Sequence, residues 1–476
     1  MRGILFHRAR PLPGRMLPAG ALALALGFAA PLYAQDQSAP PPHAQDRSAP
    51  PKPPRLDHPT APKPAHTGPV RLTELTRAHP KHLAELIKEA LKNHPAVQEA
   101  KHAWAAARER PSQAGSLPDP VLGVALQNIR TDEPALDTSP MSALQFSLTQ
   151  TFPFPGQLSR REAVARAQAD ASKQRLGLVR IQIALRVERA YWRLEYAEAA
   201  ERTTADSESL LSTVEKTVAA HYSVGHVAQQ DALSAEVAHS RLRSVLEHRR
   251  LAVSAARRAL NSAVGRTPRA DIATADKPPG GRVGLDRVAL LRDVKRRNPA
   301  INVRRAQLAA ARRGVDEAKH DRWPGIQVGL AYRYRQASPG DLSNGADMFG
   351  VSIAVPIPVW MGSKQNARVR QSYDALGAAR SGVSDQTLDA ETRFERLADD
   401  VTQLNTQVAL YQREILPETK HTVNASLSDY GVGSVGMVSV LDNWKTDLDA
   451  RVTYAKLLSD RAIRVAEVYA LAGRIP

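Results

Sequence analysis

Residues 93–97 read NHPAV and residues 297–301 read RNPAI, 204 positions further along the chain (297 − 93 = 204). Further on, residues 222–225 read YSVG and residues 430–433 read YGVG, now 208 positions apart (430 − 222 = 208). A change of four residues in the offset over so long a stretch corresponds to one small net insertion. The chain therefore contains the same unit twice, and both copies are expected to share one structural plan.

The N-terminus predicts export. Four arginines precede an uncharged apolar run from Leu17 to Ala34, which is the pattern of a secretory signal over residues 1–34. A single transmembrane anchor is the alternative, although prolines and glycines interrupt the run and it is short for a span of about 20 residues. Residues 35–69 are rich in proline and predict a disordered or polyproline-like leader. Its three histidines indicate either metal capture or a polar spacer, and the lack of fixed spacing favours the spacer: His43, His58 and His66.

Charge and cysteine content exclude several classes of protein. The net charge is +17, but basic residues alternate with acidic residues and alanine, which favours a solvated helical surface over nucleic-acid binding. The chain contains no cysteine, so it forms no disulfide and has no lipid-accepting cysteine after the signal. Any membrane association must therefore come from the fold.

Two segments in each copy alternate between apolar and polar residues, as strands do. In the second copy the strands are predicted at about 324–336 and 347–357, and in the first copy at about 119–130 and 141–152. Strands of about 9–11 residues with one apolar face suit an outer membrane, with apolar side chains toward lipid and small or polar ones toward a lumen. A soluble antiparallel sheet packed on helices has the same alternation.

Long helices follow each strand pair. No proline interrupts residues 159–221, whose apolar positions recur every three or four residues. At about 1.5 Å per residue this helix is far longer than the return helix at 229–264, and a helix at 81–114 would supply the missing length. The second copy predicts the same arrangement at 363–429, 437–471 and 291–321.

These elements give two repeats and an oligomer. The first repeat is expected at 70–280 with its hairpin at 159–264, and the second at 281–476 with its hairpin at 363–472. Four strands per chain cannot close a barrel, because the smallest closed outer-membrane barrels have about eight. Unpaired strand edges in lipid would be costly, so we expect several copies to assemble, and three would give twelve strands.

The ordered combination of duplicated NHPAV and RNPAI starts, proline-rich strand exits and Tyr-x-x-Gly turns resembles the TolC-like outer-membrane efflux protein family over about 81–474. The resemblance implies a mixed α and β fold, in which the β-barrel of a homotrimer in outer-membrane lipid continues into a periplasmic coiled-coil tunnel. It also implies a Gram-negative outer-membrane channel that accepts substrate from a periplasmic adaptor (membrane fusion protein) and an inner-membrane pump, with the resistance-nodulation-division type expected.

Proline and glycine residues are expected to mark the transition from barrel to tunnel, because proline cannot donate to a sheet ladder and is tolerated in the first turn of a helix. Glycine at the end of each segment would let the backbone turn inward. The residues are Pro153, Pro155 and Gly156 in the first copy, and Pro356, Pro358 and Gly362 in the second.

The Tyr-x-x-Gly turns join antiparallel helices, and Gly225 is expected to take a left-handed conformation. The resemblance implies that these tips dock onto the adaptor, a role that falls on Val224, Gly225, Val432 and Gly433. Glycines that only close a hairpin would fit the same pattern.

Family tunnels close near the tips through a tyrosine and carboxylates. By distance from the tip glycines, the resemblance places Tyr430, Asp231 and Asp442 in this gate, with Tyr430 bonded to Asp231. Ser439 occupies a second position that is acidic in the family, and Val435 stands where the family has an arginine. A ring of Asp442 residues would attract cations. An exposed aspartate on a helix surface is the alternative.

No catalytic motif, metal-spaced cluster or phosphate loop occurs, so we expect neither an enzyme, a resident metal nor a cofactor. The proline-rich strand exit and the histidines of the leader resemble those of family members that serve heavy-metal efflux, and this resemblance implies heavy-metal cations as the substrate. Drug efflux and type I secretion remain alternatives within the same fold. A periplasmic coiled-coil scaffold or adaptor without a pore is the alternative from another class.

Overall fold

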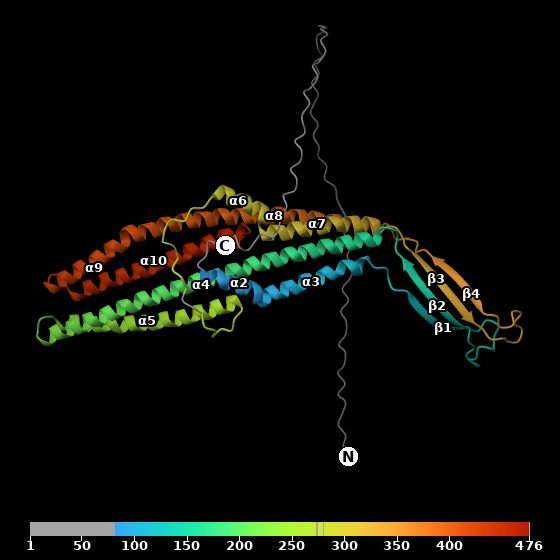
Figure 1. Cartoon of the computed structure of the whole chain (residues 1–476), viewed down its shortest axis with the longest axis horizontal. Helices are drawn as coiled ribbons and strands as arrows, with labels where there is room; N and C mark the ends of the chain where they lie inside the picture. Colours follow the sequence, from blue (N-terminus) through green and yellow to red (C-terminus); the bar gives the residue numbers. More distant parts are fainter. Residues whose placement is uncertain (1–80, 273–274, 279, 476) are drawn as a thin grey trace, which may run out of the picture. The chain divides into compact units, whose positions relative to one another are not determined.

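The computed structural model describes residues 81–272, 275–278 and 280–475, which belong to a compact unit spanning Pro69–Pro476 (Figure 1). The predicted signal at 1–34 and the leader at 35–69 lie outside these residues. Within the described part of the chain, no helix is long and apolar enough to cross a membrane.

In the described residues, four antiparallel strands form one sheet in the order β1-β2-β3-β4: β1 Val121–Gln127, β2 Ala143–Phe152, β3 Ile326–Tyr334 and β4 Met348–Ala354. β2 pairs with β3, so the hairpin of the first repeat joins the hairpin of the second in a continuous sheet. All four strands are shorter than predicted. β1 begins only after Pro120, and β4 ends before Pro356, because proline has no N–H to donate to the ladder.

The two faces of the sheet differ. Successive residues of a strand point to opposite faces, and the pairing register aligns like residues across neighbouring strands. Two rows that cross all four strands carry exposed apolar side chains: Leu122, Leu148, Leu330 and Val351, and then Val124, Phe146, Tyr332 and Phe349. The row between them on the opposite face carries small residues: Gly123, Ser147, Ala331 and Gly350.

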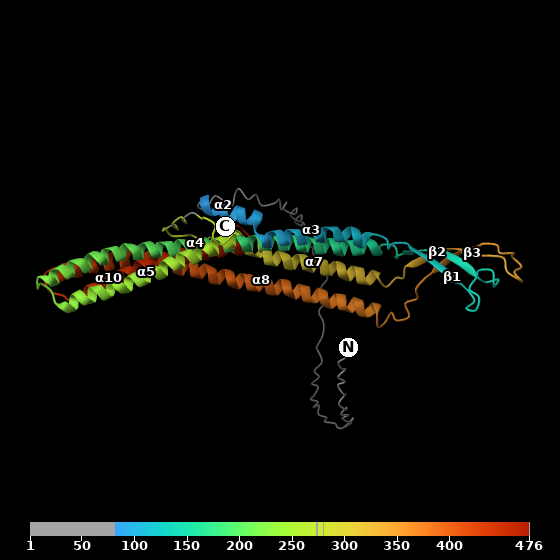
Figure 2. The same ribbon diagram turned by 90° about the horizontal axis from the view of Figure 1, so that it is seen from below.

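In the first repeat, α4 (Gln157–Ser223) is a continuous helix of 67 residues, and α5 (Gln229–Val264) returns beside it. α3 (Pro95–Gly115) packs along the part of α4 nearest the sheet, and α2 (Lys81–Asn93) lies between α3 and α5 (Figures 1 and 2). One long helix therefore lies beside shorter helices stacked end to end, as the lengths predicted.

The single helix predicted at 81–114 is wrong in one respect, since it breaks at His94. This residue has extended backbone angles, because a following proline disfavours the helical conformation, and it caps α3. The second repeat breaks in the same way between α6 (Arg287–Arg297) and α7 (Pro299–His320), where the prediction was 291–321. The Asn298 side chain accepts hydrogen bonds from the N–H groups of Ala300 and Ile301 at 2.9 and 3.0 Å. The duplicated Pro-Ala motif is thus a helix start.

The long helix of the second repeat is also interrupted. The predicted helix at 363–429 consists of α8 (Gln365–Leu410), the π-helix η2 (Tyr411–Ile415) and α9 (Leu416–Gly431). Pro417 follows directly and cannot donate to the carbonyl of Arg413, which accounts for the widened turn. α10 (Met437–Leu471) then returns beside α8 and α9.

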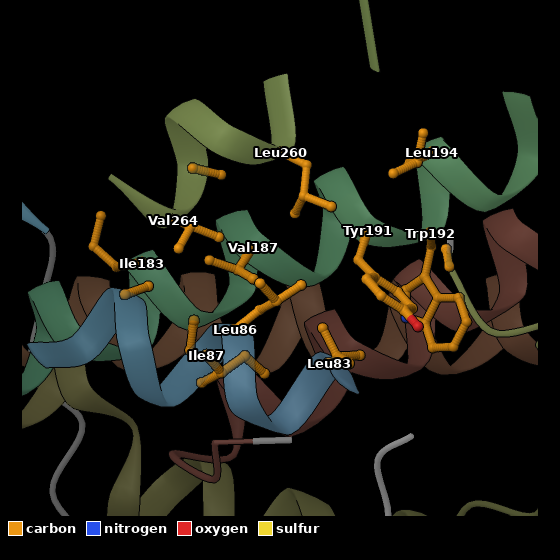
Figure 3. Close-up of a cluster of buried hydrophobic side chains, with 14 of the residues drawn as sticks. Leu83, Leu86, Ile87, Ile183, Val187, Tyr191, Trp192, Leu194, Leu260 and Val264 are labelled. Carbon is orange, nitrogen blue, oxygen red and sulfur yellow. The ribbon is translucent and has the colours of Figure 1, made fainter. Parts of the chain in front are cut away.

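The main core lies where α2, α4 and α5 meet, about midway along the helices (Figure 3). Leu83, Leu86 and Ile87 of α2 pack on the Ile183–Leu194 segment of α4 and on Leu260 of α5. A second core repeats this arrangement around Phe394 of α8, with Leu290 and Val294 of α6. These cores fix the helices between the sheet at one end and the hairpin tips at the other.

Candidate functional site

The two hairpin tips have the same backbone geometry. Gly225 and Gly433 have φ angles of 74° and 76°, the left-handed conformation expected of them. Each glycine N–H donates to the matching tyrosine carbonyl, of Tyr222 at 2.9 Å and of Tyr430 at 3.0 Å. The preceding valines, Val224 and Val432, are 65% and 80% exposed. Each tip thus presents an exposed apolar side chain on a hydrogen-bonded turn.

The structure brings Tyr430 and Asp231 together. The Tyr430 hydroxyl lies 3.5 Å from Oδ2 of Asp231, which stands in the first turn of α5. Burial, with the nearby Asp231 carboxylate, raises the pKa of Tyr430. Beneath the pair is a small apolar cluster that joins both hairpins: Val218, Ala235, Met437 and Val440. The tyrosine therefore links the second hairpin to the first.

Asp442 and Ser439 lie apart from this link. Both side chains are exposed on α10. Asp442 borders an apolar groove of about 980 Å³ between α5 and α10, which also contains Leu233, Val237 and Trp444. A single chain contributes one Asp442, so the expected ring of Asp442 side chains depends on other copies of the chain.

The first strand–helix junction is tightly packed. Pro153 and Pro155 lie between β2 and α4, and Gly156 at the start of α4 has a φ angle of 85°. A Cβ atom at Gly156 would lie 3.1 Å from Nε2 of His320, which is itself 3.0 Å from the carbonyl oxygen of Pro155. Phe154 stacks on Trp323 with ring centres 5.6 Å apart. Glycine is therefore favoured at 156, because other L residues adopt this left-handed conformation only with strain.

The second junction differs in the conformation of its glycine. Pro356 and Pro358 lie between β4 and α8 as predicted, but neither proline pair stands in the first turn of a helix. Gly362 has no positive φ, and a Cβ atom there would meet nothing within 4 Å. It lies in a longer turn before α8, where the second repeat has its additional residues, so no sharp reversal is needed there.

A buried carboxylate at the junctions escaped the sequence analysis. The side chain of Asp321 is 6% exposed and accepts a hydrogen bond from Nε2 of Gln157 at 2.6 Å. It also pairs with Arg368 of α8 at 2.6 Å and with Arg161 of α4 at 3.7 Å. Asp321, at the end of α7, therefore links α4 of the first repeat to α7 and α8 of the second, next to the sheet. Its only sequence signal was its place just before Trp323-Pro324.

Further buried carboxylates lie midway along α4. Glu195 is 3% exposed, and burial raises its pKa to about 7 against smaller opposing effects of Arg202 and Lys277. Glu198 accepts a hydrogen bond from Arg257 of α5 at 2.9 Å. No group of three or more potential metal ligands is found in the residues that the structure describes.

Comparison with known protein families assigns the chain to one of them. The profile described as "Outer membrane efflux protein" matches twice, at residues 86–266 and 290–474. The chain therefore belongs to the outer membrane efflux protein family, the channels of tripartite efflux systems, as its resemblance to TolC-like proteins predicted. The family consists of channels rather than enzymes. No curated protein matches the sequence.

Solved structures share this fold. The outer membrane protein VceC from Vibrio cholerae is 17% identical with a TM-score of 0.67, and the match covers 83% of this chain and 97% of VceC. The open-state MtrE outer membrane channel of Neisseria gonorrhoeae is 17% identical with a TM-score of 0.66, covering 82% and 89%. CusC is 18% identical with a TM-score of 0.67, covering 82% and 92%. The predicted combination of a helical part and an antiparallel sheet is confirmed.

Proposed function

We propose that this chain is the outer-membrane exit duct of a tripartite efflux system, which carries substrate passively from an inner-membrane pump and a periplasmic adaptor to the outside of the cell. The exposed apolar face of the sheet supports this most directly. Rows of leucine, valine and aromatic side chains cross all four strands, while small and polar residues predominate on the opposite face. Outer-membrane strands combine a lipid-facing apolar side with a small or polar lumen side.

Aromatic side chains at both ends of the strands support a position across the membrane. Tyr332 and Tyr334 are exposed near the β3–β4 loop, while Trp323 and Trp360 are exposed where strands meet helices. Aromatic rings collect at the two lipid–water interfaces of membrane proteins. We place the β3–β4 loop outside the cell and the helices in the periplasm of a Gram-negative bacterium.

The strand edges support a homotrimer. β1 and β4 are the edge strands of the described sheet. Their unpaired backbone groups would cost several kcal/mol each in lipid. Three chains would close a twelve-stranded barrel, and their helices would enclose a tunnel through the periplasm. Channels of this family are trimers that work with an adaptor and an inner-membrane pump. We propose a pump of the resistance-nodulation-division type for this chain.

The tips suit contact with the adaptor. Val224 and Val432 are exposed on the two turns. These turns lie at the end of the helices farthest from the sheet (Figure 1). Exposed apolar side chains on pre-ordered backbone can be buried by a partner with little loss of entropy. We propose that Val224, Gly225, Val432 and Gly433 dock onto the adaptor, and that the proline segments mark where barrel becomes tunnel.

Reconstitution tests the duct. The mature protein, purified in detergent, should insert into a planar bilayer and produce discrete conductance steps. A monomer that stays soluble without detergent and leaves the bilayer silent would instead support a periplasmic scaffold.

The gate is tested in the same bilayer. We propose that Tyr430 and Asp231 hold the tips together and that three copies of Asp442 form a cation-attracting constriction, with Ser439 at the second, uncharged position. Asp442→Asn should reduce cation preference and block by divalent cations. An unchanged preference and block would place Asp442 on an ordinary helix surface.

For the substrate we propose heavy-metal cations. The Phe152–Gly156 strand exit and the histidine-bearing leader support this choice. A deletion strain should become sensitive to copper, silver, zinc, cadmium or cobalt. Sensitivity to a drug panel alone would assign the duct to drug efflux, and loss of a secreted protein would assign it to type I secretion.

A further inference from the structure

The turn between α4 and α5 contains two histidines that the proposed function does not use. His221 lies in the last turn of α4, and His226 directly follows the left-handed Gly225. The N–H of His226 donates to the carbonyl of His221 at 2.9 Å, so the reversal of the chain fixes the two backbones against each other. Their ring centres are 6.0 Å apart, with 51° between the ring planes.

Both rings are exposed, and their nitrogens are available. Within the part of the chain that the structure describes, neither ring takes part in a side-chain hydrogen bond or an ion pair. His239 of α5 is a contrast, because its two ring nitrogens lie 3.0 Å from Glu208 and 2.5 Å from Glu215. The tip histidines thus present unused ligand atoms on a hydrogen-bonded turn.

The spacing suits a shared metal ion. Two imidazoles that bind one ion at adjacent positions, with metal–nitrogen bonds of about 2.0–2.1 Å, place their ring centres roughly 4.5–5 Å apart, about 1 Å closer than here. Small rotations of the two exposed side chains would therefore bring one nitrogen of each ring onto a common ion. We propose that His221 and His226 form a binding site for a divalent cation that prefers imidazole ligands, such as Cu²⁺, Ni²⁺ or Zn²⁺.

The surroundings favour a positive charge. The site lies at the C-terminal end of a 67-residue helix, where the helix dipole stabilises cations. His221 and His226 line a groove between the two tips, and Asp231, whose carboxylate approaches Tyr430, lines the same groove. Water would complete the coordination, because two imidazoles occupy only part of the ion's coordination shell.

The second tip provides a matched comparison within the chain. Asp429 and Ser434 stand at the positions of the two histidines, and the N–H of Ser434 donates to the carbonyl of Asp429 at 2.9 Å. The backbone is therefore the same, but the two imidazoles are missing. Each chain would hold one such ion, at the first tip only.

Titration of the full mature protein in detergent with Cu²⁺ tests the site, since Cu²⁺ binds nitrogen ligands most tightly in the divalent series. His221→Ala and His226→Ala should each remove one bound ion per chain, together with an electron paramagnetic resonance signal split by two imidazole nitrogens. His248→Ala, at an exposed position on α5, should retain both. Mg²⁺, which prefers oxygen ligands, should not compete.

A gain-of-site variant separates this site from binding by histidines elsewhere in the chain. Asp429→His combined with Ser434→His places the same pair on the second turn and should add one bound ion per chain. The proposal fails if the alanine variants bind as many ions as the parent chain, which would place all binding at other histidines. It also fails if the parent signal contains no pair of imidazole nitrogens. Neither readout depends on which substrate the duct transports.

Discussion

At the scale of single residues, Tyr222 and Tyr430 occupy matching positions in the two repeats but differ in exposure and in the contacts of their side chains. Tyr222 is 44% exposed, whereas Tyr430 is partly buried and faces Asp231 across the two hairpins. A link between hairpins therefore exists at one of two equivalent positions. We therefore expect opening of the tips to depend on Tyr430 and not on Tyr222.

Tyr430→Phe removes the hydroxyl and keeps the ring. A hydrogen bond of this kind contributes about 1 kcal/mol, so its loss should raise the open fraction of the channel roughly fivefold. Single-channel recording in a planar bilayer measures this fraction. Tyr222→Phe is the matched control and should leave it unchanged, and equal behaviour of the two variants would argue against the link.

Glu195 predicts a pH dependence of stability. Its pKa is about 7 in the folded chain, above the ordinary glutamate value of 4.5, because burial disfavours the carboxylate. The folded state therefore binds more protons than the unfolded state between these values, and the stabilisation present below pH 4.5 is lost as the pH rises through 7. This loss is at most about 3 kcal/mol.

Thermal melting of the purified protein at a series of pH values measures this loss. Glu195→Gln should flatten the decline between pH 5 and 7, since glutamine does not titrate. Glu99→Gln, at an exposed position on α3, should reproduce the parent curve. A Glu195→Gln curve that falls as steeply as the parent curve would contradict the assignment.

At the scale of elements, the two strand–helix junctions predict opposite responses to the same substitution. Gly156→Ala forces a left-handed alanine and places its Cβ 3.1 Å from His320, so it should cost about 1–2 kcal/mol or more. Gly362→Ala meets open space without a positive φ and should be nearly neutral. Melting temperatures of the two variants provide the comparison, and equal values would show that Gly156 is not constrained.

The sequence predicts elements well where periodicity alone decides them. The return helices, α5 and α10, begin and end at the predicted residues, because glycine-containing turns bound an uninterrupted apolar pattern at both ends. The breaks at His94 and in η2 were missed, since a single proline changes one turn without disturbing the apolar period on either side. Asp321 was missed because its partners come from helices far away in the sequence. The approach of Tyr430 to Asp231 was expected only through the family resemblance.

At the scale of the whole molecule, the absence of cysteine makes the proposed trimer directly testable. Introduced cysteines on the two edge strands, such as Val124→Cys in β1 with Val351→Cys in β4, should form disulfides between chains when β1 of one chain pairs with β4 of the next. Several neighbouring positions on each edge cover the possible registers.

The expected result is a ladder of one, two and three linked chains that ends at three. Val124→Cys alone should give no ladder. A ladder that continues past three chains would contradict the closed trimer, and so would the absence of any linked product across all registers.

The π-helix gives the two repeats different rotational registers. The long helices begin 208 residues apart (365 − 157 = 208) and end 208 residues apart (431 − 223 = 208), yet only the second contains the wider turn. A π-helical turn contains about one residue more than an α-helical turn. Every later side chain of the second helix is therefore rotated by roughly 100° about the helix axis relative to its counterpart in the first. In a trimer, the six hairpin tips therefore form two alternating sets of three. A partner with six equivalent contact surfaces must bind the two sets differently, or bind only one of them.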